Sequence, residues 1–386
     1  MTPHKELIKT AWLVGIKAVN GQHLVQRTLK QEQLQPTKIL AIGKAAGAMT
    51  QGALAERPNI NTLIITKQGH TPNDLSPGPT ITIIEAGHPI PDAASLRAGK
   101  AAFNFVANTT EQDTFLLLLS GGASALAEQL QPNLTLEELK YTTQEMIASG
   151  KDINAINQHR QTLSTLKGGQ LLTHFKGKQV AVYAISDVPS NEIATIGSGI
   201  GDPSQLPNNV QRTAKIIANN QDARDAAATF FQKAAIPVQF NEETLHKNLD
   251  QAAREIAERL KSGPNGAYIW GGEPTLTLPE TPGIGGRNQS LALATALNIY
   301  EMRQSGALKR NKTISLIAAG TDGTDGPTPH AGAIIDDQTI TSKERAREAL
   351  TSANATPYFA DKHALFDTGP TGTNVMDVVI ALKSNV

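Results

Sequence analysis

Short apolar, β-branched runs recur along the first two-thirds of the chain. Each run ends at glycine and polar residues, and a helix-like segment follows it. Short buried strands that alternate with helices are typical of a parallel α/β sheet. Ligands of such sheets bind beyond the carboxyl ends of the strands, so the segments that follow the runs are candidate functional loops. The runs are 38–42, 62–66, 81–85, 114–119 and 180–185.

The pattern changes in the second half of the chain. From about 208 to 263 the apolar positions follow a helical period, and a Ser-Gly-Pro-Asn-Gly cluster at 262–266 breaks it. We therefore predict two α/β domains, 1-240 and 241-386. Further strands are predicted at 267–270, 275–278, 313–318 and 378–382.

Composition narrows the function classes. The chain has 386 residues, and 35 Lys and Arg balance 35 Asp and Glu. No basic surplus exists to neutralise a nucleic-acid backbone. The absence of cysteine excludes disulfides and thiolate catalysis and fits a cytoplasmic location. The longest strongly apolar run, 115–119, is too short to span a bilayer, and the N-terminus shows no secretory signal.

Two glycine-rich loops follow apolar runs and carry groups that suit an anion. Gly43-Lys44-Ala45 places a lysine beside a predicted helix start, which is unfavourable for the helix dipole unless an anion lies between them. Ser120-Gly121-Gly122-Ala123-Ser124 offers two hydroxyls and a backbone that a ligand can approach closely. The alternatives are an exposed lysine at a turn and a tight strand-to-helix turn.

Three further segments carry candidate groups. Asp187 and Asp322 lie in loops where a carboxylate suits Mg²⁺, although aspartates also cap turns. Arg287 follows two glycines at the start of a predicted helix, where its planar fork fits a phosphate or carboxylate. A surface ion pair is the alternative for Arg287. The segment 368–374 offers hydroxyls, an amide and backbone donors, or forms an elaborate turn.

Common catalytic motifs are missing from the sequence. There is no Gly-x-x-x-x-Gly-Lys-Ser/Thr loop and no Gly-x-Gly-x-x-Gly fingerprint, so any nucleotide site is built in another way. No His-Glu-x-x-His or Gly-x-Ser-x-Gly motif occurs, which argues against zinc hydrolysis and serine acyl transfer.

Ten segments, taken in order over nearly the whole chain, resemble the glycerate 2-kinases that were once named hydroxypyruvate reductases. Each segment is a weak signal, but ten in register are specific. The segments are 43–45, 86–92, 119–126, 157–160, 167–169, 186–188, 271–273, 286–289, 320–326 and 368–374.

The resemblance implies a Rossmann-like, mostly parallel first domain, a smaller α/β C-terminal domain and an active site in the cleft between them. It implies an ATP- and Mg²⁺-dependent phosphorylation of D-glycerate at the 2-hydroxyl, in which Lys44 and Arg287 are catalytic. Asp187 or Asp322 then holds the metal or accepts the hydroxyl proton. The remaining substrate- and phosphate-binding predictions are Ser120, Gly121, Gly122, Ser124, Asn157, Arg160, Asn288, Thr371 and Asn374.

The sequence departs from the family pattern at several positions. Ala123 stands where the family usually has a third glycine, and alanine would be strained if that position needs a positive φ. Asn154 and Ala155 replace a His-Glu pair. Two loop segments after Asp187, 190–192 and 198–200, have lost acidic character and a proline. These changes leave room for a related substrate or for weakened activity.

Three alternatives stay open at this stage. An NAD(P)H-dependent hydroxypyruvate reductase would need a nicotinamide site, and the missing dinucleotide fingerprint argues against it. A kinase for another short hydroxy acid would use the same loops. A non-enzymatic binding protein on the same scaffold would have no obvious need for Lys44, Arg287 and Asp322. We expect small-molecule substrates, no nucleic acid and no membrane, and a homodimer is left open.

Overall fold

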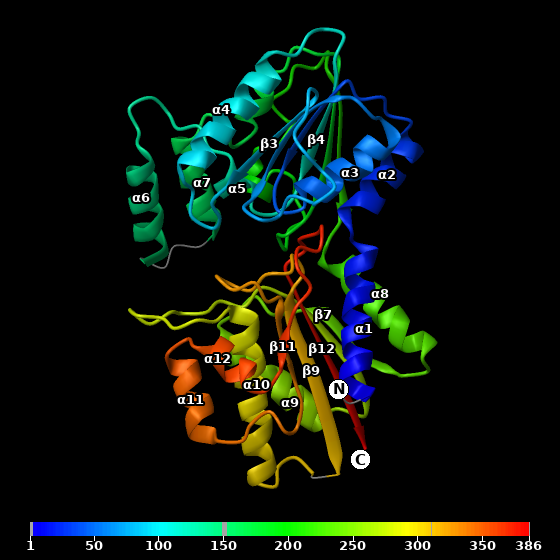
Figure 1. Ribbon diagram of the computed structural model, residues 1–386, viewed down its shortest axis with the longest axis vertical. Coiled ribbons are helices and arrows are strands. Elements are labelled where there is room, and N and C mark those ends of the chain that lie inside the picture. Colours follow the sequence, from blue (N-terminus) through cyan, green and yellow to red (C-terminus); the bar gives the residue numbers. More distant parts are fainter. Residues whose placement is uncertain (1–2, 149–152, 310, 386) are drawn as a thin grey trace. The chain divides into compact units, whose positions relative to one another are not determined.

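The computed structural model describes residues 3–148, 153–309 and 311–385 (Figure 1). The chain forms two compact units. The parallel-sheet unit comprises Asn20–Asn219 and Gly372–Val375. The mixed-sheet unit comprises the chain before Asn20, then Asn220–Thr371, and the chain from Met376 onward. No helix in the described ranges is long and apolar enough to cross a membrane.

The parallel-sheet unit contains six parallel strands in the order β3-β2-β1-β4-β5-β6. This order is that of a doubly wound sheet and confirms the predicted Rossmann-like architecture. Every residue of the central strand β4 is buried, because helices cover both faces of such a sheet. The strands are β1 (Lys38–Ile42), β2 (Asn61–Lys67), β3 (Ile81–Ala86), β4 (Thr114–Leu119), β5 (Gln179–Ile185) and β6 (Gln211–Ala218).

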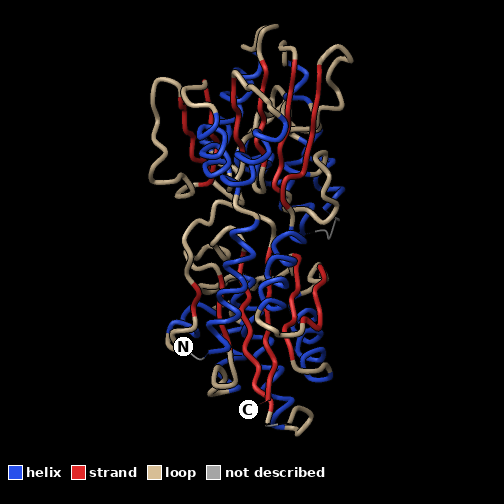
Figure 2. The backbone as a smooth tube through the Cα atoms, turned by 90° about the vertical axis from the view of Figure 1, so that its right-hand side faces the viewer, coloured by secondary structure: helices blue, strands red, loops and turns tan. Residues whose placement is uncertain are grey.

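Helices accompany the strands of this unit (Figure 2). α4 begins at a capping box, in which Asp92 accepts the N–H of Ser95 at 2.9 Å and Ser95 Oγ accepts the N–H of Asp92 at 3.0 Å. The helices are α2 (Gly21–Glu32), α3 (Ala46–Glu56), α4 (Ala93–Ala107), α5 (Ala123–Leu126), α6 (Leu136–Ala148) and α7 (Ile153–Leu163), with the 3₁₀ turns η1 (Gln170–His174) and η2 (Ile196–Gly199).

The mixed-sheet unit contains six strands in the order β11-β10-β9-β12-β8-β7, and only β7 and β8 pair in parallel. The predicted second α/β fold is thereby confirmed. Its strands are β7 (Val238–Glu243), β8 (Gly266–Gly272), β9 (Lys312–Gly320), β10 (Gly332–Ile335), β11 (Leu365–Phe366) and β12 (Asp377–Asn385). Its helices are α1 (Pro3–Ala18), α8 (Asn220–Lys233), α9 (Leu249–Ser262), α10 (Arg287–Gln304), α11 (Lys343–Thr351) and α12 (Ala355–Ala360).

The structure corrects two features of the predicted pattern. The predicted strand at 275–278 is a loop with one bridge, between Thr275 and Asn248. The predicted helical stretch from 208 to 263 contains the edge strands β6 and β7. Many of their residues are exposed or half-buried, so their sequences lack the continuous apolar run of a buried strand.

The compact units also differ from the predicted domains 1-240 and 241-386. α1 belongs to the mixed-sheet unit because it packs on α8. A side chain at Gly15 would place its Cβ 2.7 Å from the Ala223 carbonyl oxygen, so glycine permits this close approach. Relative to a single cut at residue 240, the mixed-sheet unit gains α1 and α8. The parallel-sheet unit gains the segment Gly372–Val375.

Candidate active site

The two predicted anion loops meet at the ends of the neighbouring strands β1 and β4. The Lys44 N–H donates to the Gly121 carbonyl at 2.9 Å, and the Ala45 N–H donates to Ser120 Oγ at 3.0 Å. Gly43 has a φ of 131°, and a Cβ there would lie 2.4 Å from the Ser120 carbonyl oxygen. Ser120 is buried, and its hydroxyl oxygen accepts a hydrogen bond from the neighbouring loop, so Ser120 braces the two loops.

Gly122 is the turning point of the second loop. Its φ is 90°, and a Cβ there would lie 3.3 Å from Lys44 Cγ and 3.1 Å from His88 Cδ2. The side chain of Lys44 therefore passes directly over this loop. The left-handed conformation falls on Gly122, whereas Ala123 is buried at the start of α5. The alanine that departs from the family pattern is thus accommodated without a positive φ.

Asp187 and Asn374 converge on Gly121. Asn374 Nδ2 donates to Asp187 Oδ2 at 3.4 Å. A Cβ on Gly121 would lie 1.9 Å from that amide nitrogen and 2.0 Å from that carboxylate oxygen, so only glycine fits. The structure brings Lys44, Ser120, Gly121, Gly122, Ser124, Asp187 and Asn374 together within the parallel-sheet unit.

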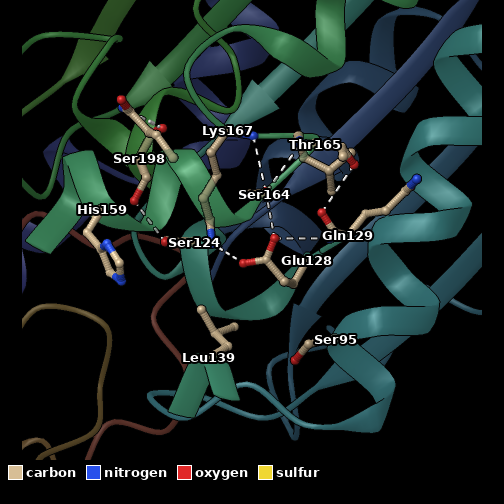
Figure 3. Close-up of polar contacts among 12 residues, drawn as sticks. Ser95, Ser124, Glu128, Gln129, Leu139, His159, Ser164, Thr165, Lys167 and Ser198 are labelled. Carbon is tan, nitrogen blue, oxygen red and sulfur yellow. Dashed lines mark hydrogen bonds and ion pairs between the residues drawn. The ribbon is translucent and has the colours of Figure 1, made fainter. Parts of the chain in front are cut away.

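A buried cluster around Glu128 and Lys167 lies near Ser124 (Figure 3). Lys167 forms an ion pair with Glu128, and both side chains are almost completely buried. Ser164 Oγ donates to Glu128 Oε1 at 2.6 Å. Burial lowers the pKa of Arg160, and the charge of Glu128 offsets this only in part. Among the described residues no carboxylate forms an ion pair with Arg160.

Asn157 lies on α7, but its side chain lies outside the described part of the structure. Its predicted role in binding therefore stays a prediction.

Arg287 is the first residue of α10 in the mixed-sheet unit. Its Nε and Nη2 donate to the two carboxylate oxygens of Asp377 at 2.6 and 3.1 Å, and its Nη1 contacts Glu273. Burial alone would lower the pKa of Arg287, but Asp377 and Glu273 outweigh it and raise the pKa. The arginine is one-third exposed (33%), so it is neither a simple surface ion pair nor closed to a ligand.

Asp325 occupies the N-terminus of α10. It accepts the N–H groups of Asn288 at 2.9 Å and Gln289 at 2.8 Å. Burial raises the pKa of Asp325 to about 6, although these two hydrogen bonds oppose the rise. A position that the sequence predicts for an external anion is thus filled by a carboxylate of the chain itself.

Asp322 and Thr371 are neighbours in the mixed-sheet unit. Asp322 Oδ1 accepts the N–H of Thr324 at 2.9 Å and its hydroxyl at 3.1 Å, which is a turn-capping role. The Thr371 N–H donates to the Asp322 carbonyl at 3.4 Å. Across the described ranges no group of three His, Asp or Glu side chains is placed to hold a metal. Mg²⁺ often uses one or two carboxylates with substrate phosphates and water, a pattern that Asp187 or Asp322 fits.

Sequence reasoning missed the groups that hold the predicted residues in place. Asp377 stands directly before an apolar run, and a carboxylate at the start of a buried strand needs a partner, which is the signal that could have identified it. Glu273 appeared in the family pattern without a role. We find no signal in the sequence that indicates the contact of Glu128 with Lys167 or that of Ser198 with Ser124.

The fold and these loops define a two-unit α/β protein with a doubly wound sheet, glycine-rich anion loops and a carboxylate-held arginine. Residues 7–230 match the domain of unknown function DUF4147, and residues 266–377 match the MOFRL family. D-glycerate 2-kinase of Thermotoga maritima is 32% identical, over 95% of this chain and 95% of that protein. Glycerate 2-kinase of Pyrococcus horikoshii is 32% identical, over 90% of this chain and 87% of that protein.

A solved structure agrees with these similarities. The crystal structure of the Thermotoga maritima glycerate kinase has a TM-score of 0.78 and 30% identity, and the match covers 98% of both chains. The chain belongs to the glycerate 2-kinase family.

Proposed function

We propose that the protein is a glycerate 2-kinase, which transfers the γ-phosphoryl group of ATP to the 2-hydroxyl of D-glycerate. The products are 2-phosphoglycerate and ADP. The observation that carries this proposal is the match of nearly the whole chain to relatives named for this activity. The clustering of Lys44 with the glycine loops, and the orientation of Arg287 by carboxylates, support it.

Lys44 and Arg287 are the proposed catalytic residues. Phosphoryl transfer gains most from fixed positive charge on the transferring oxygens. The Arg287 guanidinium is held in one plane by Asp377, and the Lys44 side chain passes over the loop at Gly122, which supports these roles. The resemblance to the glycerate 2-kinases is what assigns both residues to catalysis.

The glycerate carboxylate is assigned to the loop Ser120–Ser124 and to Arg160. Lys167 and Arg160 bring two positive charges to the single carboxylate of Glu128. A carboxylate ligand would compensate the second charge. Asn288, Thr371 and Asn374, with Asn157, are the further proposed contacts to substrate or phosphate.

The 2-hydroxyl oxygen attacks the γ-phosphorus, and the bond to the ADP oxygen breaks. We propose Asp187 or Asp322 as the group that accepts the hydroxyl proton or holds Mg²⁺. Bound with ATP, Mg²⁺ would supply positive charge at the phosphates. A cytoplasmic location and a homodimer stay predictions.

The test is incubation of the purified protein with ATP, Mg²⁺ and D-glycerate, followed by assay of ADP and of the position of the new phosphate. Lys44→Ala and Arg287→Ala should each lower kcat by about 10³-fold. Lys233→Ala and Arg254→Ala remove exposed cations of the same types and should leave kcat unchanged. Substituting EDTA for Mg²⁺ should abolish turnover.

Other outcomes separate the alternatives. ATP turnover with another short hydroxy acid only would keep the kinase and change its substrate. NADH-dependent reduction of hydroxypyruvate without ATP turnover would replace the kinase by a reductase. A folded protein that binds ATP but turns over no acid would favour the binding protein.

A further inference from the structure

Three consecutive residues of η2 have a left-handed backbone. The φ angles are 59° at Gly197, 58° at Ser198 and 77° at Gly199. Glycine adopts this conformation freely, whereas a residue with a side chain loses about 1 kcal/mol or more there. Ser198 is the middle residue and is buried. A buried residue in this conformation between two glycines motivates the hypothesis that its side chain has a role.

Two donors fix the backbone of Ser198. The Gly168 N–H donates to the Ser198 carbonyl at 2.9 Å, and Gln161 Nε2 donates to the same oxygen at 3.1 Å. The neighbouring Gly197 lies so close to α5 that a Cβ there would be 2.9 Å from Ala123 Cβ. The Ser198 hydroxyl is therefore held at a defined place beside the loop that carries Ser124.

The Ser198 hydroxyl faces the Ser124 hydroxyl, and the two oxygens lie 2.9 Å apart (Figure 3). Each hydroxyl has one proton to donate and can accept two hydrogen bonds. If Ser198 donates to Ser124, the proton of Ser124 stays available for another acceptor. The reverse direction would consume the Ser124 proton and leave nothing to donate to an anion.

We infer that Ser198 is a positioning residue, whose hydroxyl donates to Ser124 and so directs the Ser124 proton at the substrate carboxylate. The inference rests on the proposed function, because it assigns that carboxylate to the Ser120–Ser124 loop. It gives a physical reason for a left-handed serine at this place. Ser198 itself touches no reacting atom and acts through Ser124.

The test uses Ser198→Ala, Ser198→Gly, Ser124→Ala and the double variant Ser124→Ala/Ser198→Ala. We measure the KM for D-glycerate, kcat, and the Kd of D-glycerate by calorimetry without nucleotide. Ser198→Ala should raise KM and Kd about tenfold and change kcat by less than about twofold. Ser198→Gly should raise them equally, although its Tm should be higher because glycine is unstrained.

The double variant supplies the readout that a merely structural role would not give. If Ser198 acts through Ser124, then Ser198→Ala should cause no further rise of KM in the Ser124→Ala background. Ser384→Ala is the matched control, because Ser384 also shares a hydroxyl–hydroxyl contact, with Thr313 at 2.7 Å on β9 and β12 of the mixed-sheet unit. Its KM should equal that of the wild type.

Three results would overturn the inference: an unchanged KM in Ser198→Ala, recovery of KM in Ser198→Gly, or effects that multiply in the double variant. Failure of the proposed function looks different. A wild-type protein that binds D-glycerate without turnover would refute the kinase, while the Kd series would still decide the role of Ser198. A wild-type protein that neither binds nor phosphorylates D-glycerate would refute both.

Discussion

Arg287 and Asp377 are joined by two hydrogen bonds across 90 residues of chain, with Nε and Nη2 of the arginine on the two oxygens of the carboxylate. Two parallel bonds fix the plane of a guanidinium as well as its position. Because Asp377 fixes the guanidinium plane, it also fixes the direction of Nη1, which contacts Glu273. The two carboxylates differ in burial, since Asp377 is 1% exposed and Glu273 is 45% exposed.

This difference predicts unequal effects of two charge-removing substitutions. Asp377→Asn should lower the free energy of unfolding by about 2 kcal/mol, because it removes a buried charge-assisted pair, and it should lower kcat by loosening Arg287. Glu273→Gln should cost less than about 1 kcal/mol, because Glu273 itself is exposed to solvent. Urea unfolding of both variants and their kcat values give the comparison. Equal losses of stability in the two variants would show that the buried contact of Arg287 with Asp377 contributes no more than its exposed contact with Glu273.

Asp325 predicts a pH-dependent stability. Its pKa is raised from 3.8 to about 6 in the folded protein by burial. The folded state therefore binds more protons than the unfolded state between these values, so the contribution of Asp325 to stability falls as the pH rises through this range and is constant above it. Relative to Asp325→Asn, the wild type should lose up to about 3 kcal/mol between about pH 4 and about pH 7.

Urea unfolding of the two proteins at several pH values measures this difference. The subtraction cancels the groups that are far from Asp325 and leaves Asp325 with its charged neighbours Asp377 and Arg287. A difference that is independent of pH, or one that shifts in favour of the wild type as the pH rises, would contradict the assigned pKa.

The apolar pattern predicts the centre of the parallel sheet and fails at the sheet edges. β1 and β4 coincide with predicted runs because a strand covered on both faces has a continuous apolar sequence. β6 was missed because it lies at the edge of its sheet and alternates with exposed polar positions. Edge strands pair on one side and bury fewer side chains, so their sequence carries less of the pattern.

The candidate site was predictable as a set of loops but not as a set of contacts. Parallel strands bring their carboxyl ends to one edge, and this placed the loops at Gly43 and Gly121 together in advance. The partners of Arg287 and Ser124 come from distant segments, because Asp377 and Ser198 are 90 and 74 residues away along the chain. Single-sequence spacing carries no information on such pairs.

Gly121 predicts a local test of the loop at β4. Gly121→Ala would place a methyl group 1.9 Å from Asn374 Nδ2 and 2.0 Å from Asp187 Oδ2, so these side chains must move. We expect a stability loss of about 1–3 kcal/mol and a fall of kcat/KM of at least about a hundredfold. Gly78→Ala is the control, because nothing lies within 4 Å of a Cβ there. Near-normal kcat/KM in Gly121→Ala would show that Asp187 and Asn374 do not need their positions for activity.

The buried pair of Lys167 and Glu128 gives the last prediction. Lys167→Ala would leave Glu128 buried without its cation, although Ser164 Oγ and the Gln129 N–H would still donate to the carboxylate at 2.6 and 3.0 Å. An uncompensated buried charge should lower the free energy of unfolding by about 3–5 kcal/mol. Glu128→Gln keeps an oxygen for the same two donors but leaves the Lys167 ammonium buried without its carboxylate, so it should also lower the free energy of unfolding.

The double variant Glu128→Leu/Lys167→Met decides whether charge or shape matters in this pair. Replacing both ions by apolar side chains of similar volume removes the desolvation penalty together with the attraction. The double variant should therefore unfold at a higher urea concentration than Lys167→Ala, even though it carries one more substitution. If the losses of the single variants Glu128→Leu and Lys167→Met simply add in the double variant, the two sites are not coupled. Recovery in the double variant would instead show that Lys167 is present because Glu128 is charged.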